Sequence, residues 1–393
     1  MISAVSPYPA LVIVLLALGT MRIMGKLLDI EPAKGRYAPI DGLRGYMAFF
    51  VFLHHSSIWY FSLRGARWGY VPSKLYHHLG PTSVAIFFMI TAFLFAGKLI
   101  DARRGTIDWL KLYVSRVMRI MPLYAAAIAI TVFIVMILTH FTLQEPLKDI
   151  IWELAKMMVF LRPDLNGFYP TPLITAWVTW SLAFEWLFYF TLVLLGRIFF
   201  SIRASPRALI LSSLGLIFFC YIVFTFYEKD AWGRLSPFLG GIAAAFLHRN
   251  KTFCRLASGR IATCIILLCF VLPVIFYDTP FQWVPWLMLS TAFIGIACGN
   301  SLFGILTSRY SRLLGQISYS IYLLHGVVLF VMFRFVLGLD TAVRFSPLEH
   351  WIYIAWAAVG VVVLCCLTYK WIELPGMRAA GWVTKKLRRT RTQ

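Results

Sequence analysis

The sequence predicts an all-α, polytopic integral membrane protein. Of its 393 residues, 60% are hydrophobic and only 13% are charged, whereas about a quarter of the residues of a soluble globular protein are charged. The apolar residues form runs that extend from one end of the chain to the other, and a spanning helix needs about 20 of them. Because no soluble segment or internal repeat interrupts these runs, we expect one polytopic domain.

About eleven apolar runs are long enough, or nearly so, to cross a bilayer. They cover approximately residues 8–28, 42–61, 82–100, 121–141, 176–199, 207–227, 235–248, 260–277, 283–302, 316–336 and 350–372. The first run lacks the basic start and small-residue cleavage site of a signal peptide, so we expect it to remain as a span. The short run 235–248 is a span or a re-entrant segment, and 150–161 is expected to be interfacial or re-entrant.

The longest segment expected outside the cytoplasm, about residues 142–175, contains the sequence RPDLNGFYPTP (162–172). Its prolines and glycine disfavour a helix, and together with its aromatic residues they indicate an ordered loop.

The net charge of +21 would suggest a nucleic-acid partner in a soluble protein. Here the loops alternate in charge, and most Lys and Arg fall on one side if the N-terminus is outside the cell. This is the pattern of cytoplasmic loops, so we expect no nucleic acid. The chain ends in KKLRRTRTQ, a basic cytoplasmic tail (377–393) that would touch anionic lipid headgroups.

The seven cysteines lie mostly within or beside apolar runs. None forms a CxxC pair, and no cysteine and histidine have the spacing of metal ligands. The sequence therefore predicts small apolar packing residues, with no disulfide and no metal.

The stretch DGLRGYMAFFVFLHHSSIWYF (41–61) places polar groups within an apolar run. Asp41 is expected to cap the helix, and Arg44 lies in its first turn, where it grips a ligand or snorkels to the surface. His55 follows Arg44 by eleven residues, which puts it on nearly the same face and about 16 Å deeper. His54 points elsewhere. Intramembrane ionisable groups are functional by default, and the alternative is a histidine satisfied by core hydrogen bonds.

Three further runs contain polar residues. Arg116 and Arg119 are spaced i, i+3, share a helix face just before the span at 121 and suit either phosphate binding or membrane anchoring. Glu185 and His325 each fall about nine residues into a span, near the midplane, and Tyr322 shares the face of His325. Such groups act in function or tie helices together. The layout suggests a polar path from the cytoplasm, with an anionic ligand at its mouth and a general base deeper.

Six segments occur in a characteristic order. They are IDGLRGYMAFFVFLHH (40–55), SVAIFFMITAFLFAGKL (83–99), RVMRIMPLY (116–124), TWSLAFEWLFY (179–189), GQISYSIYLLH (315–325) and YKWIELPG (369–376). Over residues 36–376 the chain resembles the acyltransferase-3 family of membrane-bound O-acyltransferases, which decorate bacterial surface polysaccharides. Thr91 and Ala92 replace the family's usual serine and glycine, and Trp186 replaces a second acid, which leaves Glu185 as the only acid of its motif.

The resemblance implies ten core spans, so residues 1–35 would be an additional span with its cytoplasmic loop. We expect no SGNH esterase domain, which some family members carry after the last span. The family's location is the bacterial cytoplasmic (inner) membrane, and the expected topology has the N-terminus out and the C-terminus in. The sequence does not indicate an oligomeric state.

The resemblance also implies a reaction. Acetyl-CoA or another acyl-CoA would be a co-substrate from the cytoplasm, with no bound cofactor. Asp41, Arg44, Arg116 and Arg119 would hold the CoA end, since arginine pairs bind phosphates well. His55 would be the general base for a sugar hydroxyl, or the carrier of an acyl-histidine intermediate. The supporting motif residues are Trp180, Ser181, Tyr319, Tyr322 and Glu373.

Glu185 and His325 are expected to orient the base or to meet the acceptor, a surface polysaccharide or lipid-linked glycan. Aromatic residues at the predicted outer ends form an interfacial belt or stack on sugars; they are Trp59, Tyr60, Trp68, Tyr70 and Tyr169. Two other functions are compatible with a polytopic chain. A transporter would also place charges at midplane, and a scaffold would not need the Arg44–His55 stripe.

Overall fold

The computed structural model describes residues 3–32, 37–227 and 231–389. Within these ranges the chain is mostly helical, and no strand forms. Contacts group the chain into two compact units, one made of Met1–Gly97 and Asp230–Cys366, the other of Lys98–Lys229 and Leu367–Gln393. We call them the first and the second unit. The boundary expected between residues 35 and 36 lies outside the described residues.

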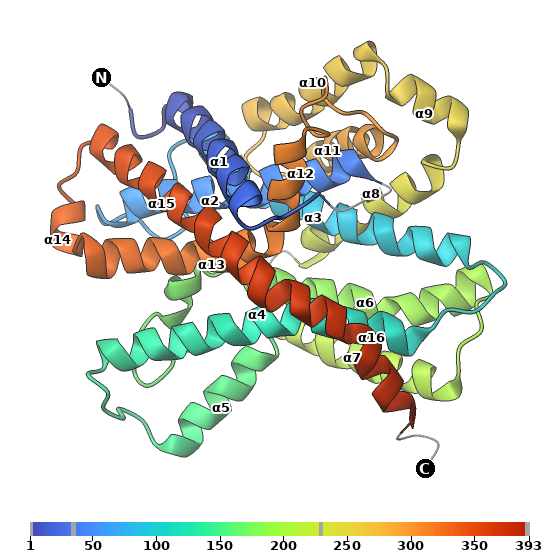
Figure 1. Cartoon of the computed structure of the whole chain (residues 1–393), viewed down its shortest axis with the longest axis horizontal. Coiled ribbons are helices and arrows are strands. Elements are labelled where there is room, and N and C mark those ends of the chain that lie inside the picture. The colour runs from blue at the N-terminus through green and yellow to red at the C-terminus, as the bar shows by residue number, and fades with distance from the viewer. Residues whose placement is uncertain (1–2, 33–36, 228–230, 390–393) are drawn as a thin grey trace. The chain divides into compact units, whose positions relative to one another are not determined.

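The helices of the first unit come from the N-terminal quarter of the chain and from residues 230–366 (Figure 1). They are α1 (Pro7–Leu27), α2 (Ala38–Ser62), most of α3 (Lys74–Asp101), α8 (Ala231–Leu247), α9 (Lys251–Ala257), α10 (Arg260–Phe276), α11 (Trp283–Ala297), α12 (Arg309–Gln316), α13 (Ser318–Val331), η3 (Met332–Val336), α14 (Leu339–Ala342) and nearly all of α15 (Pro347–Thr368). Helix α2 is buried over most of its length and packs against α12 and α13. It is therefore the central helix of this unit.

Glycines let α2 and α12 approach each other closely. A Cβ atom on Gly315 would lie 1.8 Å from the carbonyl oxygen of Asp41, and one on Gly45 would lie 2.7 Å from the backbone nitrogen of Gly315. Only a residue without a side chain fits at such a contact. The glycines of the DGLRG and GQIS segments thus set the distance between the two helices. Helix α1 packs on the same α12.

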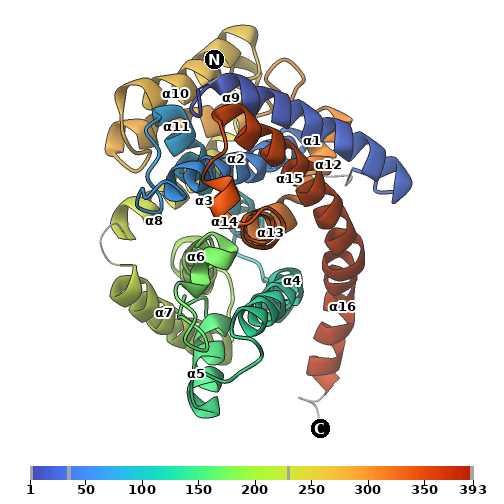
Figure 2. The same ribbon diagram turned by 90° about the vertical axis from the view of Figure 1, so that its left-hand side faces the viewer.

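The second unit contains the central part of the chain and its C-terminal end. Its elements are α4 (Trp109–Leu138), α5 (Leu147–Met158), η1 (Thr171–Thr175), α6 (Trp180–Phe200), α7 (Pro206–Phe226), η4 (Tyr369–Glu373) and α16 (Leu374–Arg389). Helices α6 and α7 lie side by side (Figure 2), and α16 runs along α4 (Figure 1). The expected basic tail therefore begins as a helix that packs on α4. Residues 390–393 lie outside the described residues.

Length and hydropathy confirm an all-α polytopic membrane protein. Seven described helices could cross a membrane, or eight if α9 and α10, bent by 71°, form one broken span. Of the about eleven runs expected, those at 235–248 and 283–302 become the shorter apolar helices Gly233–Leu247 and Trp283–Ala297. Helix α2 is not among the seven, because its polar residues lower its mean hydropathy. Its buried position shields these residues from lipid.

Two local expectations concern the second unit's connecting segments. The run at 150–161 is mostly the helix α5, whose apolar Ile151 and Trp152 are exposed. Residues 162–170 form an ordered loop, as expected, and residues 171–172 begin η1. In this loop, Asn166 accepts a hydrogen bond from Gln144 N at 2.8 Å and donates to Thr139 Oγ1 and Thr142 O.

Two other local expectations were wrong. Asp41 does not cap α2, because the helix starts a turn earlier at Ala38, with proline in its first positions. Asp41 instead lies in the first turn, where a carboxylate still favours the helix dipole. Arg116 and Arg119 also do not lie before the helix that contains the run at 121–141, but within it. This helix begins at Trp109, capped by Asp108, and continues through Pro122.

Candidate functional site

Two histidines meet in the core of the first unit. His325 Nε2 lies 3.0 Å from His55 Nδ1, and both rings are buried. Each ring is also fixed to its own helix, since His55 Nδ1 lies 3.0 Å from the carbonyl oxygen of Val51 and His325 Nδ1 lies 2.8 Å from that of Ile321. The contact between the rings joins α2 to α13. Two histidines that were predicted as separate candidate site residues thus form one buried pair.

The hydrogen bonds assign the protons of the pair. A carbonyl oxygen only accepts, so His325 Nδ1 carries a proton and donates it to Ile321 O. Burial favours the neutral ring, which leaves His325 Nε2 as an acceptor for the Nδ1–H of His55. That Nδ1–H is shared with Val51 O. His55 Nε2 then carries the lone pair, and it is the atom that these contacts leave for a substrate.

Aromatic side chains line the pair. Trp68, on the loop after α2, stacks on His55 with ring centroids 6.2 Å apart and an interplanar angle of 18°. Trp59 packs edge-on against Trp68 at 5.6 Å. Tyr322, one turn before His325 on the same helix, has its ring centroid 6.4 Å from that of His325. The ring of His54 also packs edge-on against that of His55, with centroids 5.0 Å apart. The pair therefore lies among aromatic rings and a third imidazole.

The neighbouring His54 has a different task. Its Nδ1 lies 2.8 Å from the carbonyl oxygen of Tyr76, which it serves as donor. A Cβ atom on Gly80 would lie 2.4 Å from its ring. His54 thus fastens α2 to the start of α3, which is the role of a satisfied core histidine.

Asp41 and Arg44 lie at the start of the same continuous helix as His55 and are half-buried. Arg44 and His55 share a face but stand eleven residues apart, about 16 Å along the axis. They are therefore two ends of one stripe rather than one contact. Tyr319, the other supporting residue of α13, is half-buried.

A second polar cluster lies inside the second unit. The Tyr189 hydroxyl donates a hydrogen bond to Glu185 Oε1 one turn away on α6, and Arg116 on α4 hydrogen-bonds to the same hydroxyl. The deep carboxylate is thus hydrogen-bonded to a tyrosine, which in turn contacts an arginine. Sequence reasoning missed Tyr189, although its i, i+4 spacing from Glu185 was a usable signal.

Other motif residues of the second unit hold helices together. Arg119 lies 3.0 Å from the sulfur of Met377 on α16, and Glu373 in η4 is fully buried. Ser181 donates to the carbonyl oxygen of Val178 at 3.3 Å. The Arg119–Met377 contact therefore joins the RVMRIMPLY segment to α16, directly after the YKWIELPG segment.

The aromatic motif positions of α6 also pack within this unit. Trp180 packs edge-on against Phe184, with centroids 5.5 Å apart. Trp186, at the position of the family's usual second acid, is buried and stacks on Phe219. This apolar site is no place for another carboxylate.

Comparison with known proteins rests on one match. The family model described as "Acyltransferase domain" matches residues 37–370. No curated protein and no solved structure matches the chain. The match contains the histidine pair, the Arg116–Tyr189–Glu185 cluster and nearly all of the motifs described above. It covers most of the sequence, and the chain therefore belongs to the acyltransferase-3 family of multi-pass membrane acyltransferases.

Proposed function

We propose that the protein is an acyl-CoA-dependent O-acyltransferase. It takes an acyl group, acetyl in the simplest case, from CoA at the cytoplasmic side of a bacterial inner membrane. The acceptor is a hydroxyl of a surface polysaccharide or lipid-linked glycan. The observation that supports this best is the buried His55–His325 pair, whose hydrogen bonds occupy His55 Nδ1 and leave the lone pair on His55 Nε2.

In this reaction His55 Nε2 takes the proton of the acceptor hydroxyl as the oxygen attacks the thioester carbonyl. The carbon–sulfur bond breaks, and the CoA sulfur leaves with the proton from His55. The products are an ester and free CoA thiol. His325 positions the base, since its Nε2 accepts from His55 Nδ1. This contact strengthens as His55 becomes positively charged, because charge-assisted hydrogen bonds are the stronger ones.

The donor end of the site would use cationic residues. Arg44, with Asp41 in the turn before it, and Arg119 are assigned to the phosphates of CoA, which guanidinium groups bind bidentately. Arg116 shares this role and also hydrogen-bonds to Tyr189, whose hydroxyl donates to Glu185. Trp68, stacked on His55, is suited to pack against a sugar ring.

A matched pair of substitutions tests the proposal. In both His54→Asn and His55→Asn the amide can replace the Nδ1–H donor, but only His55→Asn removes a lone pair that the mechanism uses. Acetyl content of the surface polysaccharide is measured by NMR in wild type, a deletion strain and complemented strains with equal membrane expression. We expect acetate to vanish in the deletion and to return with His54→Asn but not with His55→Asn.

Two outcomes count against the proposal. Full acetylation with His55→Asn would refute the role of His55, and unchanged acetylation in the deletion would refute the polysaccharide acceptor. Donor dependence is tested separately with radiolabelled acetyl-CoA and membranes. Intact-protein mass without acceptor then separates direct transfer from an acyl-histidine intermediate, because only the latter adds an acyl group to the chain.

A further inference from the structure

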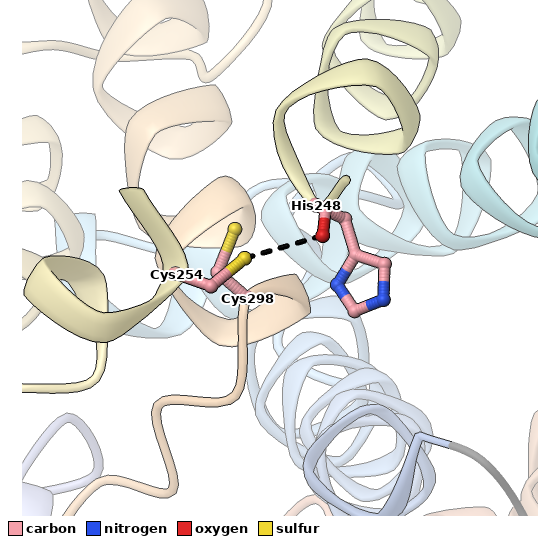
Figure 3. A group of neighbouring side chains, drawn as sticks. All are labelled: His248, Cys254 and Cys298. Atoms are coloured by element: carbon pink, nitrogen blue, oxygen red, sulfur yellow. Dashed lines mark hydrogen bonds between the residues drawn. The ribbon is translucent and has the colours of Figure 1, made fainter. Parts of the chain in front are cut away.

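A second cluster of reactive side chains lies in the first unit, apart from the histidine pair. His248 follows the last residue of α8, Cys254 is on α9 and Cys298 follows α11 (Figure 3). One potential ligand atom from each residue lies within 4.8 Å of the other two. Cys298 is buried, while His248 and Cys254 are half-buried, so an ion can reach the site. The sequence spacing gave no indication of this cluster.

Hydrogen bonds hold the backbone around the two thiols. Ser258 Oγ lies 2.8 Å from the carbonyl oxygen of Cys254 and 3.2 Å from that of Cys298, so its hydroxyl bridges the two segments. Asn300 Nδ2 donates to the carbonyl oxygen of Ala257 at 2.9 Å. These contacts keep the end of α9 beside the end of α11 whether or not an ion is bound.

The imidazole is held in place by two aromatic rings. Tyr37 packs edge-on against His248 with centroids 5.2 Å apart, and Phe93 does so at 5.6 Å. Figure 3 shows one ring nitrogen of His248 on the side that faces the two sulfur atoms. The Cys254 thiol donates to the carbonyl oxygen of His248 at 3.3 Å. The three ligand groups thus converge on one point.

The geometry points to a Zn²⁺ site formed by His248, Cys254 and Cys298, and we propose that the protein binds one ion there. Zinc–sulfur bonds of about 2.3 Å and zinc–nitrogen bonds of about 2.0–2.1 Å place tetrahedral ligands about 3.6–3.8 Å apart. Closing a triangle whose sides are at most 4.8 Å therefore needs movements of about 1 Å or less. A water molecule would complete the fourth position.

Charge and protons also balance at this site. The two thiols lose their protons on binding and the imidazole binds in its neutral form, so that Zn²⁺ with two thiolates carries no net charge. A neutral site is favourable at the edge of a membrane protein, where a bare charge is costly. The expected topology places these residues at the cytoplasmic side, where thiols stay reduced and metal binding is favoured over a disulfide.

The ion would connect the segment from the end of α8 to α9, which carries His248 and Cys254, to the end of α11, where Cys298 lies. Because Tyr37 packs on His248 and directly precedes α2, the same ion would also steady the start of the helix that carries Asp41 and Arg44. We therefore assign the zinc a structural role near the donor end of the proposed reaction.

Metal content of the purified full-length protein tests the site directly. Cys298→Ser and His248→Ala remove ligands, and Cys264→Ser, an exposed cysteine on α10, is the matched control. After expression with zinc and removal of loosely bound metal, we expect about one zinc per chain in wild type and Cys264→Ser. The two ligand variants should lose most of it. Equal zinc in all four proteins, or none in wild type, would overturn the proposal.

Two measurements on the wild-type chain keep the test decisive if a ligand variant does not fold. Titration of metal-free protein with Co²⁺ should produce a thiolate-to-cobalt absorption band, and added zinc should protect Cys254 and Cys298, but not Cys264, from maleimide. A missing band, equal labelling of all three cysteines, or a Cys254–Cys298 disulfide in freshly isolated protein would each refute the site. None of these readouts depends on acyl transfer.

Discussion

Replacing Gly315 with alanine should separate the two helices that carry the histidine pair. The added Cβ would lie 1.8 Å from the carbonyl oxygen of Asp41, whereas real Cβ contacts essentially never fall below 3.0 Å. The atom it meets belongs to the backbone, so it cannot turn aside as a flexible side chain would. Helices α2 and α12 must therefore move apart by at least 1.2 Å, the difference between these two distances.

This displacement is large compared with the tolerance of the pair. Helix α13, which carries His325, follows α12 after the single residue Ile317. If α13 moves with α12, the present distance of 3.0 Å between His325 Nε2 and His55 Nδ1 would grow to about 4 Å, beyond hydrogen-bonding range. Misplacement of a catalytic group by 1 Å can cost about 100-fold in rate, and overpacking of a core costs about 1–3 kcal/mol.

The assay measures both effects on the purified protein in lipid nanodiscs. We expect Gly315→Ala to lower the apparent melting temperature and to reduce acyl transfer per folded molecule by about 10- to 100-fold. Gly360→Ala is the control, because a Cβ atom on Gly360 of α15 meets nothing within 4 Å. That variant should keep wild-type activity and gain up to about 1 kcal/mol, since alanine favours a helix.

The reasoning is refuted if Gly315→Ala retains wild-type transfer and stability. A variant that is less stable but transfers acyl groups at the normal rate would show that the close approach supports the fold without aligning the pair. Equal losses in Gly315→Ala and Gly360→Ala would indicate a general intolerance of added side chains. Only a loss specific to Gly315→Ala agrees with the geometry.

Three further substitutions have defined expectations. Tyr189→Phe removes the hydroxyl between Arg116 and Glu185. The free energy of unfolding should therefore fall by about 1–3 kcal/mol, and acyl transfer should decrease. Wild-type stability and transfer would contradict a role for this hydroxyl. His54→Ala should lower the melting temperature yet retain transfer per folded molecule, because its hydrogen bond is structural; loss of transfer at normal stability would argue otherwise. Asn166→Ala removes three hydrogen bonds in the loop after α5, so limited proteolysis there should accelerate, and unchanged cleavage would contradict this.

The sequence by itself determined the class of protein and the positions of most helices. Placing polar groups in lipid is costly, so a segment that crosses the membrane must be apolar over its spanning length. This requirement applies to each segment separately and can therefore be read from the sequence. The stripe of Arg44 and His55 was equally predictable, because helical periodicity fixes which residues of one helix share a face. The ordered motifs then indicated the family that the match over residues 37–370 confirmed.

Helix boundaries were less predictable at prolines, because a proline is found both at the start of a helix and inside one. Pro122 looked like the start of a span, but α4 begins at Trp109 and includes this proline in its interior. A Cβ atom on Gly376 would lie 3.0 Å from the Pro122 ring. Helix α16 therefore packs closely against α4 at this interior proline. Hydropathy alone could not show this contact, since it carries no information about which helices pack against each other.

Only the tertiary structure decided which distant polar residues meet. His55 and His325 are 270 residues apart in the chain, and hydropathy carries no information about which helices pack together. Their contact depends on glycines that permit one particular approach of α2 to α12. The same holds for Arg116 with Tyr189 and for His248 with Cys298, because each pairing is fixed by the packing of whole helices and not by the spacing of residues along any one of them.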